Sequence, residues 1–124
     1  MSDRSHAQKG AVLIIEDERS VADALKIILQ DEGYHVSTVL TGHDGIEEAL
    51  RGEFCLAITD IGLPDMSGFD VIKAVCPHKQ MHFIVITSQN LMIEAQDCGA
   101  AGFLLKPFQP SEIVELIRTT LARS

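Results

Sequence analysis

The fold of this chain is decided by Ala11–Asp17, with the sequence AVLIIED, in which an aliphatic run ends in two acids. An uninterrupted aliphatic run is typical of a strand in a parallel sheet that is covered on both faces. Three later strand-like runs also end in a reactive side chain, namely Asp60, Thr87 and Lys106. The carboxyl ends of parallel strands share one edge of a sheet, and open α/β sheets bind ligands there. We therefore expect these side chains to converge in one crevice.

Strand-like and helix-like segments alternate along the chain. The predicted strands are Ala11–Ile15, Tyr34–Val39, Phe54–Thr59, His82–Ile86 and Gly102–Leu105. Apolar residues at helical spacing predict helices within Val21–Leu29, Ile46–Leu50, Phe69–Val75, Asn90–Cys98 and Ile113–Leu121, with Gly33, Pro77 and Gly99 as stop signals and Ser111 as an N-cap. Five such units with short connections predict an α/β fold with a right-handed, doubly wound parallel sheet. The strand order 2-1-3-4-5, one of two common orders, makes the first and third strands neighbours.

The length of the chain predicts one domain. With 124 residues it can bury about two-thirds of its unfolded surface. We expect a polar tail over residues 1–10, without the apolar core of a signal peptide, and a single domain over residues 11–124. No apolar stretch approaches the ~20 residues of a membrane span. The three cysteines, Cys55, Cys76 and Cys98, form no Cys-x-x-Cys pair and indicate reduced thiols in a cytoplasmic protein.

The charge of the chain excludes some partners. A net charge of −8 argues against direct binding of nucleic acid or of an anionic membrane surface, because both would be repelled. The five histidines are scattered without the spacing of metal ligands, and we interpret them as surface or loop residues.

Glu16, Asp17 and Asp60 would place three carboxylates in one pocket. Carboxylates at this distance repel one another, so they require raised pKa values or a bound cation. Mg²⁺ fits, because it binds one or two carboxylates, retains water and accepts phosphate oxygens as further ligands. Alternatively, the acids interact with the positive end of the first helix, which is the preferred interpretation for Glu18. For Asp17 and Asp60 we favour the metal.

Asp60 is best placed to act as a nucleophile that forms an acyl phosphate. Lys106, together with Mg²⁺, would neutralise charge on the transferred phosphoryl oxygens. A structural ion pair is the alternative role for Lys106. Thr87 is a candidate phosphate ligand, although a hydroxyl at a strand end often satisfies local backbone instead.

These motifs resemble the receiver domain of bacterial two-component response regulators, and the resemblance extends from about Ala11 to Ala122. It depends on four motifs in order: Val12–Glu18, Asp60–Pro64 with Gly68, Ile86–Ser88, and Gly99–Phe108. The resemblance implies a flavodoxin-like fold and a non-enzymatic phosphoacceptor in phosphorelay signal transduction.

The resemblance also implies roles for single residues. Asp60 would accept a phosphoryl group from the phosphohistidine of a sensor histidine kinase or a histidine phosphotransfer protein. Mg²⁺ would be bound by Asp17, by Asp60 and by the backbone carbonyl of Gly62, with Glu16 acting through a water molecule. Lys106 would contact the phosphoryl oxygens.

Two further features follow from the resemblance. The Lys106–Pro107 peptide bond is expected to be cis. Thr87 and Phe103 match the family's switch pair, in which the hydroxyl moves toward the phosphate and the ring turns inward. An ordinary core position is an equal alternative for Phe103.

The chain departs from the family pattern between Thr87 and Lys106, which is about three residues short, nearly one helical turn. The loss must lie in or beside Asn90–Cys98, on the family's usual output surface. There, Leu91–Ile93 is an apolar run that one short helix cannot bury completely. Partial exposure and a partner-binding patch are both open interpretations.

The chain ends at Ser124, which leaves no room for a DNA-binding or enzymatic output domain. We expect a stand-alone regulator or a fragment of a longer protein. A stand-alone regulator would dock to an unidentified downstream protein or drain phosphoryl groups from a relay.

Two alternative functions fit the sequence less well than a phosphoacceptor. A metal-dependent phosphohydrolase with an aspartate nucleophile usually carries a second carboxylate two residues later, where this chain has Gly62. A flavin-binding protein would need a Gly-, Ser- or Thr-rich loop after the first strand. This chain has Glu16–Glu18 there, which repels a phosphate.

Overall fold

The aliphatic runs form one parallel sheet in the computed structural model, which describes residues 9–123. Its strands are β1 (Ala11–Ile15), β2 (His35–Val39), β3 (Leu56–Asp60), β4 (His82–Thr87) and β5 (Gly102–Leu105). Every pairing is parallel, and the strand order is β2-β1-β3-β4-β5. The predicted α/β fold and strand order are confirmed.

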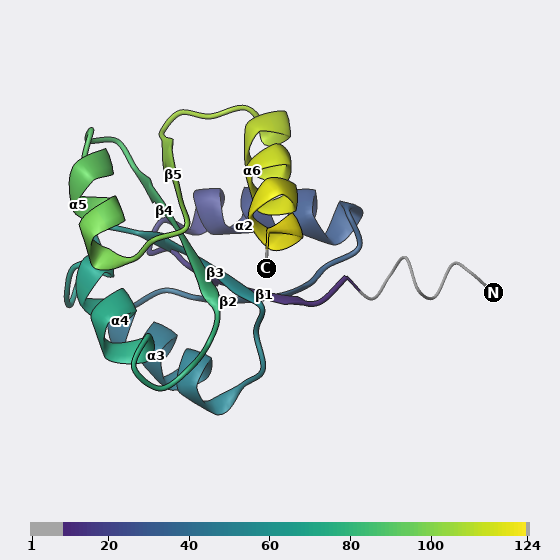
Figure 1. The fold of residues 1–124 in the computed structure, drawn as a ribbon. Coiled ribbons are helices and arrows are strands. Elements are labelled where there is room, and N and C mark those ends of the chain that lie inside the picture. The colour runs from purple at the N-terminus through teal and green to yellow at the C-terminus, as the bar shows by residue number, and fades with distance from the viewer. Residues whose placement is uncertain (1–8, 124) are drawn as a thin grey trace.

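Helices cover both faces of this sheet (Figure 1). They are α2 (Arg19–Asp31), α3 (Gly42–Arg51), α4 (Gly68–Val75), α5 (Met92–Cys98) and α6 (Pro110–Ala122). Helices α2 and α6 lie on one face, and α3, α4 and α5 lie on the other. Within residues 9–123, no helix combines the length and the apolar character needed to cross a bilayer.

The core consists of two apolar clusters, one on each face of the sheet. Side chains along a strand alternate between faces. Val12 and Ile14 of β1 therefore pack toward α2 and α6, whereas Leu13 and Ile15 pack toward α3, α4 and α5. All four are fully buried, which explains why this strand is uniformly aliphatic rather than alternately polar.

Several predicted boundaries differ from the structure. Strand β3 begins at Leu56 and includes Asp60, and β4 extends through Thr87. Helix α5 begins only at Met92, with Leu91 as an N-cap that makes no side-chain capping bond. Its predicted end is confirmed, because Gly99 adopts the left-handed conformation (φ 98°) that glycine tolerates best.

The predicted N-cap Ser111 is wrong. The N-cap is Gln109, two residues earlier, and helix α6 begins at Pro110. The fixed φ of proline suits the first helical position, where a missing N–H costs nothing. Gln109 and Glu112 form a capping box in which the backbone N–H of Gln109 donates to Glu112 Oε1 at 2.6 Å.

The segment between β3 and α4 folds back on itself. The Gly68 amide donates to the Ile61 carbonyl at 3.0 Å, and Gly62 and Ser67 form an antiparallel bridge. Gly68 packs so tightly that a Cβ atom there would lie 2.2 Å from the Asp60 carbonyl oxygen. The chain after Asp60 is therefore held close to the end of β3.

Gly68→Ala is expected to lower the free energy of unfolding by about 1–3 kcal/mol, because the added methyl group meets backbone rather than a flexible side chain. Gly62→Ala is the matched control, since a Cβ atom there has open space and the change should stay within about 0.5 kcal/mol. Urea unfolding of the three proteins measures both values. Equal stability of the Gly68 variant and the wild type would contradict this packing.

Candidate functional site

The strand register brings charged residues together at the carboxyl edge of the sheet. Ile15 pairs with Thr59, so the next residues, Glu16 and Asp60, lie on neighbouring strands. Each charged side chain also follows, by two residues, a side chain that packs toward α2 and α6. These pairs are Ile14 and Glu16, Ile58 and Asp60, and Leu104 and Lys106.

Lys106 joins two of the carboxylates directly. Its Nζ lies 3.0 Å from Glu16 Oε1 and 3.0 Å from Asp60 Oδ2. Its backbone amide donates to the Thr87 carbonyl at 2.8 Å, which continues the pairing of β4 and β5 by one residue. The sheet thus positions the lysine. Lys106 links Glu16, which is 90 residues away in sequence, and Asp60, which is 46 residues away, in one network.

Burial separates the roles of the acids. Glu16 is fully buried, and its second oxygen accepts a hydrogen bond from the Glu18 amide at 3.0 Å. Asp60 is 9% exposed, whereas Asp17 is exposed. Asp60 is therefore reachable from solvent while its neighbour Glu16 is closed in.

The pKa values of Glu16 and Lys106 respond to this environment. Burial raises the pKa of Glu16 above its usual value of 4.5, although the Glu18 amide and Lys106 act in the opposite direction. Burial alone would lower the pKa of Lys106. Hydrogen bonds from Lys106 to Asp60 and Glu16 outweigh that effect and raise it. The Lys106 shift reflects the neighbouring carboxylates, whereas the Glu16 shift reflects mainly its burial.

The carboxylates fit a divalent cation. One oxygen from each of Glu16, Asp17 and Asp60 lies within 4.8 Å of the others. Three carboxylates and one ammonium leave a formal charge of −2, which matches Mg²⁺ or another hard cation with oxygen ligands. Glu16 is fully buried, whereas Asp17 is exposed and Asp60 is 9% exposed, so Asp17 and Asp60 are the more accessible for direct ligation.

The remaining predicted site residues lie close to this pocket. The Gly62 amide is 3.4 Å from Asp60 Oδ1, and Gly62 is exposed; the metal-ligand role of its carbonyl stays a prediction. Thr87 ends β4 with 4% exposure, and its hydroxyl oxygen accepts from the Gln89 amide at 3.2 Å. The predicted cis bond between Lys106 and Pro107 is present.

Thr87 and Phe103 occupy the opposite face of the sheet from Lys106. Phe103 pairs in register with Val85, and both belong to the cluster under α3, α4 and α5. Thr87 follows Val85 by two residues and so shares its face. Phe103 is only half-buried, which leaves space for the ring to move.

An apolar groove adjoins the charged pocket. It has a volume of about 550 Å³ and lies between α2 and the segment that leads into α6. Val21, Ala24 and Ile28 line one side, and Phe108 lines the other, with Lys106 at its edge. A partner that reached Asp60 from this side would meet an apolar surface next to the reactive group.

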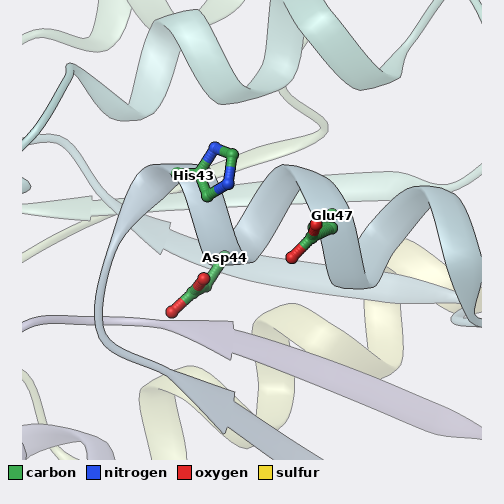
Figure 2. Close-up of side chains that lie close together, drawn as sticks. All are labelled: His43, Asp44 and Glu47. Carbon is green, nitrogen blue, oxygen red and sulfur yellow. The ribbon is translucent and has the colours of Figure 1, made fainter.

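The sequence analysis missed a second group of possible metal ligands. His43, Asp44 and Glu47 lie on the first turns of α3, all exposed, with ligand atoms within 4.8 Å of one another (Figure 2). Their spacing on a helix is a signal that the sequence carries. The positive partial charge of a helix N-terminus opposes a cation at this position, so the buried pocket at Asp60 is the better cation site.

The apolar run at α5 is exposed in part. Met92 is 48% and Ile93 is 69% exposed, and Leu105 on the adjacent β5 is 43% exposed. The expected partial exposure is therefore observed. A partner at this surface stays a prediction.

Known proteins share this architecture and sequence pattern. Residues 12–118 match the family described as the response regulator receiver domain. The chain is similar to the transcriptional regulatory protein DltR of Streptococcus agalactiae, with 35% identity over 91% of this chain and 52% of the relative. It is also similar to the response regulator ArlR of Staphylococcus aureus, with 32% identity over 90% of this chain and 52% of that protein. The chain spans about half the length of these curated relatives.

Solved structures agree. A receiver domain protein from Methanospirillum hungatei superposes with a TM-score of 0.86 and 31% identity, covering 91% of this chain and 94% of the other. The receiver domain of a LuxO repressor homologue from Vibrio parahaemolyticus gives 0.86 and 33%, covering 92% and 91%. The chain belongs to the response regulator receiver domain family of two-component signalling systems.

Proposed function

We propose that Asp60 is the phosphoacceptor of a signalling switch. The observation that supports this most strongly is the contact of Lys106 with Asp60 Oδ2 at 3.0 Å, beside a cluster of three carboxylates. A carboxylate that is partly accessible and paired with a fixed ammonium can attack an electrophilic phosphorus atom while the charge of the transferred group is neutralised.

The donor in this proposal is a phosphohistidine on a sensor histidine kinase or a histidine phosphotransfer protein. An Asp60 oxygen forms the new bond to phosphorus, and the bond between phosphorus and the imidazole nitrogen breaks. The imidazole leaves with the electron pair of that bond, and it leaves as neutral imidazole because its other ring nitrogen carries a proton. The apolar groove beside Lys106 supports docking of a helical protein that carries such a histidine.

Asp17, Asp60 and the Gly62 carbonyl would hold Mg²⁺, with Glu16 acting through a water molecule. When bound, the ion would supply charge neutralisation for phosphoryl oxygens. The pocket's formal charge of −2 and the raised pKa of Lys106 beside Asp60 and Glu16 support this assignment.

Phosphorylation would be read out through Thr87 and Phe103. The Thr87 hydroxyl oxygen accepts a hydrogen bond from the Gln89 backbone amide. In this proposal the hydroxyl moves to donate a hydrogen bond to a phosphate oxygen, and the half-buried Phe103 ring turns inward. The change alters binding of a downstream protein or removes phosphoryl groups from a relay. A phosphohydrolase is less well supported, because Gly62 stands where a second carboxylate would be needed.

Asp60→Asn is expected to abolish phosphorylation. A small acyl-phosphate donor with Mg²⁺ should add one acid-stable, base-labile phosphoryl group to the wild-type protein and none to the variant, since the amide is not a nucleophile. Intact-mass spectrometry measures this directly. Asp44→Asn, at an exposed acid on α3, is the control and should be labelled like the wild type. Unchanged labelling of the Asp60 variant would place the acceptor at another residue.

Lys106→Ala is expected to slow labelling about 100-fold, in the range measured when one charge-stabilising donor is removed from an active site. Lys79→Ala is the matched control, because Lys79 is also partly buried but binds the Gly52 carbonyl at 2.9 Å. The rate with the same small donor should not change in that variant. Thermal unfolding of both variants separates slow chemistry from loss of fold. A Lys106 variant that reacts at the wild-type rate would leave the lysine with a structural role only.

Glu16→Gln is expected to change the pH dependence of stability. A raised pKa means that the folded state binds a proton more tightly than the unfolded state, so stability falls as pH rises from about 4.5 through the raised pKa. In chelator, the thermal midpoint of the wild type should therefore fall relative to the Gln variant over this range. Added Mg²⁺ should raise the wild-type midpoint more than that of the variant. A wild type that gains stability relative to the variant as pH rises would contradict the assignment.

A further inference from the structure

The N-terminus of α3 is capped by two different segments. The first two amides of the helix, Gly42 and His43, each donate to one oxygen of Asp65, both at 2.8 Å. The Asp44 amide donates to the Thr41 hydroxyl at 3.1 Å. An α-helix leaves its first amides without internal partners, so this pattern satisfies three of them. Thr41 directly precedes the helix, whereas Asp65 lies 23 residues after Gly42 and 22 residues after His43.

Asp65 belongs to the segment that follows Asp60. That segment is closed at its base by the bond from Gly68 to Ile61 and by the bridge between Gly62 and Ser67. Its tip, with Asp65, reaches across to the start of α3, which also carries the exposed side chains of Figure 2. The segment is thus fixed at its base, where Gly62 takes part in the bridge, and at its tip through Asp65.

The contact between the tip and α3 is close. A Cβ atom on Gly42 would lie 2.4 Å from Met66 Cγ and 3.3 Å from Asp65 Oδ1, so glycine is what lets the two segments meet. A carboxylate at a helix N-terminus also interacts with the positive end of the helix. In agreement, the His43 and Gly42 amides lower the pKa of Asp65, which keeps the carboxylate charged.

We propose that Asp65 is a positioning residue for the cation site: its bidentate contact with α3 fixes the segment that carries Gly62. This inference rests on the proposed function, in which the Gly62 carbonyl is a Mg²⁺ ligand. In this proposal both Asp65 oxygens are used by the Gly42 and His43 amides, and Asp65 would not itself be a metal ligand. It acts as an outer-shell residue acts on a metal ligand, by limiting the positions that the ligand can adopt.

Thr41 separates this role from simple stabilisation of α3. Both Thr41 and Asp65 cap the same helix, so Thr41→Ala and Asp65→Ala should both lower the thermal midpoint. Of these two capping residues, Asp65 is the one that belongs to the segment with Gly62. A loss of Mg²⁺ affinity that is specific to the Asp65 variant therefore reports positioning.

The test is a Mg²⁺ titration of the wild type, Asp65→Ala, Asp65→Asn and Thr41→Ala, followed by the NMR signal of the Gly62 amide. We expect Asp65→Ala to weaken Mg²⁺ binding about tenfold, as is typical for outer-shell residues. Asp65→Asn, which keeps one acceptor oxygen, should give a smaller loss, and Thr41→Ala should bind like the wild type. Hydrogen exchange in chelator should show faster exchange of the Gly42 and His43 amides in Asp65→Ala.

Several results would overturn the inference. These are wild-type affinity in Asp65→Ala, an equal loss in Thr41→Ala, or a Gly62 signal that does not respond to Mg²⁺ in the wild type. Labelling of the wild type with a small acyl-phosphate donor, measured by mass spectrometry, separates a failure of the positioning role from a failure of the proposed function. Labelling at Asp60 together with equal affinities refutes only the positioning role, whereas the absence of labelling refutes the proposed function.

Discussion

The site depends on one interaction, the double ion pair of Lys106 with Glu16 and Asp60. It joins the ends of β1, β3 and β5, and no pairing of strands alone would make that connection, because β1 and β5 are not neighbours. A buried ion pair contributes little net stability, since the cost of removing the charges from water offsets their attraction. Stability alone therefore does not account for three charged groups at this edge.

The alternation of side chains divides the site between the two faces of the sheet. Glu16, Asp60 and Lys106 lie on the side of the sheet that α2 and α6 cover. Thr87 and Phe103 lie on the side that α3, α4 and α5 cover. At the strand ends the Lys106 amide donates to the Thr87 carbonyl and so links the two sets. In the proposed switch, this link would connect a change of charge at Asp60 to the opposite face.

Sequence reasoning succeeded where the signal was local. The aliphatic run before Glu16 predicted β1, and the reactive residues after three other runs predicted the shared edge, because strand identity and direction follow from short patterns. It failed at Ser111, where a serine looked like a good cap but Pro110 already suited the first helical turn. It could not find the contact of Asp65 with α3, because a hydrogen bond over more than 20 residues leaves no periodic trace. Repulsion among the three carboxylates predicted either a bound cation or raised pKa values, but not that burial would be the main cause of the raised pKa of Glu16.

The segment after Asp60 connects the end of β3 with the start of α3. Gly68 packs it closely against the start of α4, and Asp65 accepts hydrogen bonds from the first amides of α3. Lys106 constrains the side chain of Asp60, and this segment constrains the backbone that follows it. In the proposed function both constraints would matter, because the side chain would face the incoming phosphorus and the neighbouring carbonyl would stay within reach of a cation. The first constraint comes from a long-range ion pair and the second from a helix cap, on different faces of the sheet.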